Sequence, residues 1–280
     1  MAPSPTQHCA PSVLKTLTVC LILQLVSSFS GSSMSQERPL EEQSDRLSRW
    51  HNRWDEKRIG WHREEVNPGL IKYGTVDKDS CPAEGLRWFV PLCGKTVDMA
   101  YLASQETTAE VVGVDGVLKA LESFVEDHPE LKIEQQPPTG KFEKLTGTKI
   151  TLLKGDFFAL DVEATGGQFD TVFDRASMVA IDPSLREDYV NVIGKLLKPG
   201  GKIILGTLER RTGEEEAVKK GPPFSISEAE VRRLYEKLDW VESITLVEEI
   251  DEFARTPEDK IRYEGVTSLY ELYFLIQAKA

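Results

Sequence analysis

Apolar residues along this chain fall into two kinds of run, which alternate over most of its length. One kind is short and almost wholly apolar, as expected of strands that are covered on both faces of a parallel sheet. These runs lie at 88–90, 111–115, 149–154, 169–175 and 203–208. The other kind has apolar residues every three or four positions, as in a helix with one buried face. Examples are Val117, Ala120, Leu121, Phe124 and Val125, and further on Leu185, Tyr189, Val192, Ile193 and Leu196.

This alternation of strand and helix predicts the fold. Two further strands, near 240–248 and 268–278, would form a hairpin at the C-terminus. We therefore predict an α/β domain with a single doubly wound, seven-stranded, mostly parallel sheet, helices on both faces and this antiparallel C-terminal hairpin. Residues 132–148 are expected to be a loop with room for one edge strand, and residues 209–220 a charged, mobile loop.

The most informative stretch joins the first strand to the second through a glycine turn. Gly94 lets the backbone turn tightly and lets a ligand approach it closely. Thr96 is a candidate cap for the helix that follows, and the next strand ends at Asp115, 21 residues after Gly94. An acid about 20 residues past a glycine turn is where the hydroxyls of a nucleotide ribose are held. The stretch therefore predicts a ribose-binding site at the ends of the first two strands.

The turn lacks the glycines of a dinucleotide site. Leu92 stands where a G-x-G-x-x-G loop has its first glycine, and a pyrophosphate needs several backbone N–H groups at close range. A ligand with a ribose and no phosphates fits better, and S-adenosylmethionine is a common one. The alternative is a buried strand–turn–helix that binds no ligand, because glycine turns and strand-end acids are common.

Three tryptophans precede this stretch. Trp50 and Trp54 are four residues apart and so share one face of a helix, and Trp61 follows. One hypothesis is an amphipathic helix that anchors the N-terminal part to the core. The other is a lid, at about residues 40–70, whose indole rings cover a cation. The sulfonium of S-adenosylmethionine is such a cation, and tryptophan is the aromatic residue that binds cations best.

Residues 1–35 differ from the rest of the chain and are interpreted as a leader. Lys15 precedes a mostly apolar run at 17–26, and small residues follow. This is the pattern of a secretory signal peptide, with a possible cut before Phe29, and the run is too short to span a bilayer. A phenylalanine at that point also resembles two-part plastid presequences, and a disordered extension is the alternative. The folded domain is expected at 36–280.

Composition narrows the class of partner. The 280 residues include 46 acidic and 34 basic side chains, for a net charge of −12. A phosphate backbone is bound by clustered Lys and Arg, so a small molecule is favoured over nucleic acid. Cys81 and Cys93 have no C-x-x-C spacing, and no group of His, Cys and acids has the spacing of metal ligands. We therefore expect no metal site.

Four blocks of sequence together resemble the thiopurine S-methyltransferase family. They occur in the family's order, follow a tryptophan pair, and are PLCGK at 91–95, VGVD at 112–115, FDRASMVAI at 173–181 and GPPF at 221–224. The resemblance implies a class I, Rossmann-like methyltransferase domain that uses S-adenosylmethionine to methylate a small-molecule thiol or a related soft nucleophile. It also implies a cytoplasmic protein if the leader does not direct secretion or plastid import. We expect a monomer without stable membrane insertion after leader removal.

The resemblance also assigns roles to individual residues. Arg175 and Arg262 are the candidate catalytic residues, since a cation beside the acceptor would stabilise a bound thiolate; Arg255 competes with Arg262 for its role. Asp156 would accept a hydrogen bond from the adenine and Phe157 would stack on it, although Asp156 could instead only cap a turn. The residues implied to contact the cofactor are Trp50, Trp54, Trp61, Leu92, Asp115, Asp156, Phe157 and Arg175.

Two other functions are compatible with the sequence. A relative that methylates halide, thiocyanate, or selenium and tellurium compounds would share the fold and the cofactor, and the products from a panel of acceptors would separate it. A binding protein could keep the cofactor positions without turnover, and its mark would be binding without methyl transfer. The natural acceptor is not readable from the sequence, because loops make the acceptor pocket.

Overall fold

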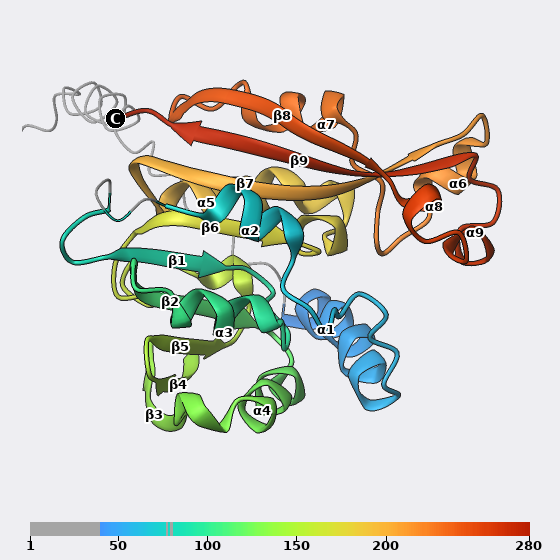
Figure 1. Ribbon diagram of the computed structural model, residues 1–280. Coiled ribbons are helices and arrows are strands. Elements are labelled where there is room, and N and C mark those ends of the chain that lie inside the picture. The colour runs from blue at the N-terminus through green and yellow to red at the C-terminus, as the bar shows by residue number, and fades with distance from the viewer. Residues whose placement is uncertain (1–39, 77, 79–80) are drawn as a thin grey trace, which may run out of the picture. The chain divides into compact units, whose positions relative to one another are not determined.

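The sheet is built outward from β1 (Leu86–Val90), the strand that leads into the glycine turn (Figure 1). This computed structural model describes residues 40–76, 78 and 81–280. Within these residues, nine strands form one sheet in the order β3-β4-β5-β2-β1-β6-β7-β9-β8. The other strands are β2 (Thr108–Asp115), β3 (Glu134–Thr139), β4 (Phe142–Gly147), β5 (Ile150–Lys154), β6 (Phe169–Arg175), β7 (Leu197–Arg211), β8 (Val241–Asp251) and β9 (Ser268–Ala278).

Helices cover both faces of this sheet (Figure 1). The α-helices are α1 (Leu40–Asp55), α2 (Pro68–Gly74), α3 (Val97–Ser104), α4 (Leu118–Asp127), α5 (Arg186–Leu196), α6 (Glu215–Lys219), α7 (Glu228–Tyr235), α8 (Glu252–Arg255) and α9 (Asp259–Arg262). Short 3-10 helices are η2 (Pro129–Leu131), η3 (Phe157–Ala159), η4 (Met178–Ala180) and η5 (Pro183–Leu185).

Two hydrophobic cores lie on opposite faces of β1, because successive side chains of a strand point to opposite sides. Phe89 packs in one core with Tyr189 of α5 and the apolar face of α7. Trp88 and Val90 pack in the other core with residues of α2, α3 and α4, among them Leu102. This double cover explains the unbroken apolar runs, and it confirms the predicted α/β sheet with helices on both faces.

The order of the parallel strands places a crevice beside β1. Strands β5, β2, β1, β6 and β7 run parallel, and the chain builds β2 and β5 on one side of β1 and β6 and β7 on the other. In open α/β sheets a ligand binds outside the carboxyl ends of the strands, at the point where the strand order reverses. The carboxyl ends of β1 and β6 are that point here.

The sheet has two more strands than the seven predicted. β3 and β4 form an antiparallel hairpin that joins the sheet through β5, within the segment predicted to be mainly loop. The outer strand β3 contains Pro137 and Pro138. Proline has no N–H to donate and is therefore tolerated at a sheet edge, which is why this segment looked like a loop in the sequence.

The C-terminal hairpin is confirmed, and it forms a longer arm than expected. β8 and β9 are antiparallel, and β9 also pairs with β7 as far as Arg211. β7 extends to Arg211 and α6 follows it at Glu215–Lys219. Most of the segment 209–220 is therefore regular structure, and the predicted loop there is wrong. Figure 1 shows the far ends of β7 and β9, with α6, α8 and α9, reaching past the carboxyl end of β1 on the side where α1 lies.

The N-terminal predictions lie mostly outside the described residues. These include the leader at 1–35 and its cut before Phe29, so they stay predictions. Residues Leu40–Ala280 form one compact unit. Among the described residues, every helix is too short or too polar to cross a membrane.

Candidate active site

The turn after β1 is bonded directly to the acid that ends β2. The Gly94 N–H donates to Oδ2 of Asp115 and the Val117 N–H donates to Oδ1, each at 2.8 Å. The Cys93 N–H donates to the Val114 carbonyl at 2.9 Å. Gly94 has a φ of +53°, in the left-handed region that favours glycine. The acid found by its spacing from Gly94 is therefore hydrogen-bonded to the turn, at the crevice.

Burial raises the pKa of the Asp115 carboxyl. This residue is 8% exposed, and burial raises its pKa from the ordinary 3.8 to about 6. The N–H groups of Val117 and Gly94 oppose that rise. A ligand whose hydroxyls donate to the carboxylate would favour the ionised form in the same way.

We expect Asp115 and Asp174 to contribute less and less stability to the unliganded protein as the pH rises from about 4 to about 6. Asp174, at the end of β6, accepts a hydrogen bond from the Tyr189 hydroxyl at 2.8 Å, and burial raises its pKa to about 6 as well. Asp115 and Asp174 thus bind protons more tightly in the folded than in the unfolded chain. The stability that they contribute is complete below pH ~4 and is lost as the pH passes ~6.

Urea unfolding at pH 5, 5.5, 6 and 6.5 measures this loss. In the Asp174→Asn variant one of the two groups is gone, so the fall in unfolding free energy across this range should be smaller. A fall equal to that of the wild type would contradict the raised pKa of Asp174.

Two strained residues mark the ends of the paired strands β1 and β6. Leu92 has a φ of +44° and Ala176 a φ of +63°, although neither is glycine. The Ser177 hydroxyl donates to the Pro91 carbonyl at 2.6 Å and so joins the two turns. Such conformations persist where the surroundings hold them, and they are concentrated at functional sites. Leu92 and Ala176 lie where the strand order of the sheet reverses, between β1 and β6.

The three tryptophans form one aromatic cluster against the glycine turn. The ring of Trp61 lies edge-on to Trp50, with centroids 5.3 Å apart, and to Trp54, at 6.3 Å. Trp54 is buried, and a Cβ added at Gly94 would lie 3.3 Å from its ring. The shared face of Trp50 and Trp54 therefore packs toward the site, and their contact with a cofactor stays a prediction.

The two candidate arginines reach the segment that carries Trp61. Arg175, at the end of β6, donates from Nη1 to the Trp61 carbonyl at 2.7 Å, and burial lowers its pKa. Arg262 is exposed on α9 and donates to the Gly60 carbonyl at 3.4 Å, near the limit for a hydrogen bond. Arg175 is therefore held firmly at the crevice, whereas Arg262 approaches it loosely.

Arg255, the competitor of Arg262, is occupied by carboxylates. It lies 2.5 Å from Glu252 and 3.0 Å from Glu271. Glu271 also accepts a hydrogen bond from the Tyr273 hydroxyl at 3.0 Å. Because its charge is already balanced, Arg255 is poorly placed to bind a thiolate, and the structure favours Arg262 between the two.

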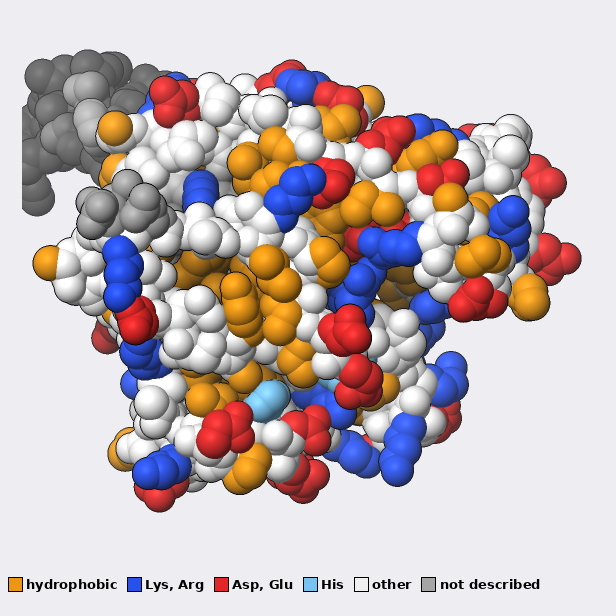
Figure 2. Space-filling model, viewed as in Figure 1, with side chains coloured by type: hydrophobic (Ala, Val, Ile, Leu, Met, Phe, Trp, Pro, Cys, Tyr) orange, Lys and Arg blue, Asp and Glu red, His pale blue; other side chains and the backbone are white. Residues whose placement is uncertain are grey.

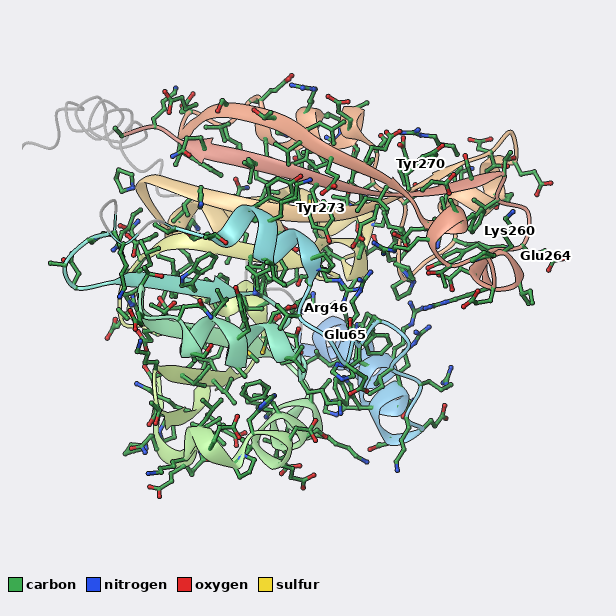
Figure 3. All side chains as sticks on the ribbon, viewed as in Figure 1. Arg46, Glu65, Lys260, Glu264, Tyr270 and Tyr273 are labelled. Carbon is green, nitrogen blue, oxygen red and sulfur yellow. The ribbon has the colours of Figure 1, made fainter. Side chains whose placement is uncertain are left out.

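At the end of β5 the adenine candidates are arranged differently from the prediction. Asp156 caps η3 by accepting the Phe158 N–H at 3.3 Å, and it pairs with Arg46 of α1 at 2.9 Å. Figure 3 shows Arg46 where α1 meets the rest of the domain. Phe157 is 2% exposed and stacks on Tyr189 within the core, at 4.5 Å, so this position disagrees with stacking on an adenine. Phe158 is only partly buried, beneath the Arg46 guanidinium at 4.8 Å, and is the better candidate.

Replacing Arg46 by methionine is expected to loosen α1. The change removes the ion pair with Asp156 and the cation over Phe158, which join α1 to a segment 110 residues away. A partly exposed pair of this kind contributes about 1 kcal/mol, so amide hydrogen exchange in α1 should accelerate about fivefold. Arg49→Met, on the same helix, is the matched control, and an equal acceleration there would contradict the assignment.

Sequence reasoning missed Arg46, Ala176 and Ser177. The bonds of Arg46 and Ser177 join residues 110 and 86 positions apart, and no local pattern indicates such contacts. For Ser177 the block at 173–181 was a signal that this turn is special, but it did not say which strand the hydroxyl would reach.

Named relatives match nearly the whole described domain. The sequence profile of the family described as Thiopurine S-methyltransferase matches residues 46–279. The thiopurine S-methyltransferase of Legionella pneumophila (strain Philadelphia 1) is 36% identical over 228 residues, which cover 81% of this chain and 96% of that protein. The thiopurine S-methyltransferase of Vibrio atlanticus is 34% identical over 231 residues, with coverages of 82% and 97%. All site residues named above lie within the matched range.

Solved methyltransferase structures resemble the fold at low sequence identity. The N1-methyltransferase of 1,6-didemethyltoxoflavin from Burkholderia thailandensis, solved with S-adenosylhomocysteine, superposes with a TM-score of 0.54 at 17% identity, covering 87% of this chain and 92% of that one. Phosphoethanolamine N-methyltransferase 2 of Haemonchus contortus, solved with S-adenosyl-L-methionine, gives a TM-score of 0.53 at 16% identity, with coverages of 75% and 51%. These likenesses show the class I methyltransferase fold and leave the acceptor open.

Proposed function

Because this chain belongs to the thiopurine S-methyltransferase family, we propose that it methylates the sulfur of a small-molecule thiol, with S-adenosylmethionine as the methyl donor. Family membership makes the chain a methyltransferase, and the thiol acceptor is what the proposal adds. The observation that carries it is the buried Asp115 carboxylate bonded to the Gly94 turn, with the tryptophan cluster packed against that turn and Arg175 hydrogen-bonded to Trp61 of the cluster.

The residues at the crevice fit this cofactor. A carboxylate has about four lone-pair sites, and in Asp115 each oxygen accepts one backbone N–H. Both oxygens therefore keep capacity for the two hydroxyls of a ribose. The turn at Leu92 and Gly94 brings backbone close to that carboxylate. Asp156 and Phe158, which both contact Arg46, lie at the end of β5, where the adenine would bind.

The tryptophan cluster would cover the charged end of the cofactor. Indole rings attract cations through their faces, more strongly where water is excluded. Trp54 closes the site at the Gly94 turn, and Trp61 links α1 to Arg175 through its carbonyl. When bound, S-adenosylmethionine supplies a methyl group made electrophilic by the positive sulfonium. The cluster would orient this group toward the acceptor and exclude water, which competes as a nucleophile.

The acceptor side is marked by a guanidinium. Arg175 uses one of its five N–H groups for the Trp61 carbonyl, so others remain for an acceptor sulfur. The thiolate is the reactive form of a thiol, and a nearby positive charge favours that form. Arg175 would therefore hold the acceptor as its thiolate, and the thiol proton would leave to solvent before the reaction.

An assay with methyl-labelled S-adenosylmethionine and a panel of acceptors tests the proposal. Thiopurines and aryl thiols are expected to give labelled thioethers, and the Asp115→Asn variant should give far less label at low cofactor concentration, which excludes a contaminating enzyme. If the label appears only on iodide, thiocyanate or selenols, the acceptor belongs to that class and the proposed thiol acceptor is wrong. Cofactor binding without label on any acceptor would mean that the protein does not catalyse methyl transfer.

A further inference from the structure

A recess lined by arginines lies beside the tryptophan cluster. It is a cavity of about 520 Å³ lined by Ser48, Arg49, Asn52, Arg53, Arg58 and Gly221, and we call it the arginine recess. This volume is within the range of small-molecule sites. Figure 2 shows Lys and Arg side chains along the hollow between α1 and the arm that carries α8 and α9.

The arginine recess adjoins the acceptor side of the crevice. The guanidinium carbon of Arg53 lies 5.7 Å from the ring centre of Trp50 and 5.8 Å from that of Trp61. The carbonyl of the same Trp61 accepts the hydrogen bond from Arg175. Trp61 therefore lies next to Arg53 of the recess through its ring and next to the guanidinium expected to hold the acceptor sulfur through its carbonyl.

The positive charge of the recess is poorly balanced. Arg58 has a carboxylate partner on its own segment, but in the part of the chain that the structure describes no ion pair joins Arg49 or Arg53 to an acid. Arg49 acts on Asp182 only weakly, since the pKa of Asp182 is lowered mainly by Ser184 and least by Arg49. Burial lowers the pKa of Arg53, as do three neighbouring arginines. In a chain of net charge −12, cations held together in this way favour an anionic ligand.

Guanidinium groups bind carboxylate and phosphate through paired, charge-assisted hydrogen bonds. On the basis of the proposed function, we propose that the acceptor thiol carries a second, permanently anionic group, a carboxylate or a phosphate, which Arg49 and Arg53 bind in the recess. The sulfur of the same molecule then lies on the far side of Trp61, beside Arg175. Such an anchor, away from the reacting atom, positions the acceptor for an in-line reaction.

Matched pairs of acceptors test this proposal. The first pair is 4-mercaptobenzoate and 4-mercaptobenzamide, and the second is 6-thioinosine 5′-monophosphate and 6-thioinosine. With rates corrected for the thiolate fraction, kcat/KM of the wild type should be at least about tenfold higher for the anionic member of one or both pairs, mainly through KM. A preference in only one pair tells a carboxylate from a phosphate.

The variants locate the anion site. Arg49→Gln should reduce the anionic-to-neutral ratio of kcat/KM about tenfold, and Arg53→Lys should keep part of the ratio because it keeps the charge and loses the planar fork. Lys195→Gln removes one charge from the last turn of α5. This turn leads into the start of β7, at the amino ends of the parallel strands and away from the crevice at their carboxyl ends. This control should leave the ratio unchanged.

A binding measurement without turnover completes the test. Calorimetry on the wild type saturated with S-adenosylhomocysteine should show benzoate binding that Arg49→Gln weakens, and little binding of benzamide. Equal rates for both members of both pairs, or equal effects of Arg49→Gln and Lys195→Gln, would overturn the anion site while thiol methylation stands. If neither member of any pair is methylated, it is the proposed function that fails.

Discussion

The Asp115→Asn variant is expected to bind S-adenosylmethionine at least about tenfold more weakly than the wild type. The carboxylate accepts the N–H groups of Gly94 and Val117 and keeps capacity for two ribose hydroxyls. A charge-assisted hydrogen bond contributes about 1.5–3 kcal/mol, so losing one costs a factor of about 10 to 150 in affinity. Asparagine also turns an NH₂ group toward one backbone N–H, which loosens the turn. Isothermal titration calorimetry measures the change.

The same carboxyl predicts how the affinity depends on pH. In the unliganded protein its pKa is about 6, and hydroxyl donors favour the ionised form. Below pH ~6 the cofactor must displace a proton, so its affinity should fall by up to about tenfold per pH unit. This dependence should disappear in the Asp115→Asn variant, because an amide does not titrate.

Asp174→Asn is the matched control. It also removes a buried carboxyl with a pKa of about 6, but the bonds of Asp174 go to Tyr189 and Met178. This variant is expected to keep most of its cofactor affinity. Equal losses of affinity in the two variants would indicate general damage to the strand ends, and the ribose contact of Asp115 would then be wrong.

The parts of the site that the sequence predicts well are those that depend on short spacings. Gly94 and Asp115 are separated by one helix and one strand, so the lengths of regular elements bring them together. Trp50 and Trp54 share a face because of the helical period alone. The strand count was wrong because Pro137 and Pro138 are read as loop residues unless the strand is known to be an edge.

Other parts depend on contacts that no local pattern encodes. The burial of the Phe157 ring was not predicted, because η3 is three residues long, too short for any periodicity to show which of two adjacent phenylalanines is buried. The link from Arg46 to Asp156 requires α1 to lie on the sheet in one particular place. The arginine recess has the same origin, since Gly221 joins residues of α1 only in the folded chain.

Replacing Arg175 by methionine is expected to lower kcat/KM for aryl thiols about a hundredfold. The variant loses the charge beside the sulfur and the hydrogen bond to the Trp61 carbonyl, each a charge-assisted contact of about 1.5–3 kcal/mol. Arg262→Met is the matched comparison and should lose less, because Arg262 is exposed and its bond to Gly60 is 3.4 Å long. A larger loss in Arg262→Met would reverse the roles of the two arginines.

The pH dependence of the reaction then decides whether Arg175 acts on a thiolate or a base removes the proton. If the acceptor binds as its thiolate, the acidic limb of kcat/KM should follow the thiol pKa from one acceptor to the next. His62 is the rival base, since burial and the charge of Lys95 lower its pKa and keep it neutral at pH 7. A limb that stays at one pH for every acceptor, and that disappears in His62→Asn, would assign the proton to His62 and leave Arg175 only the task of binding.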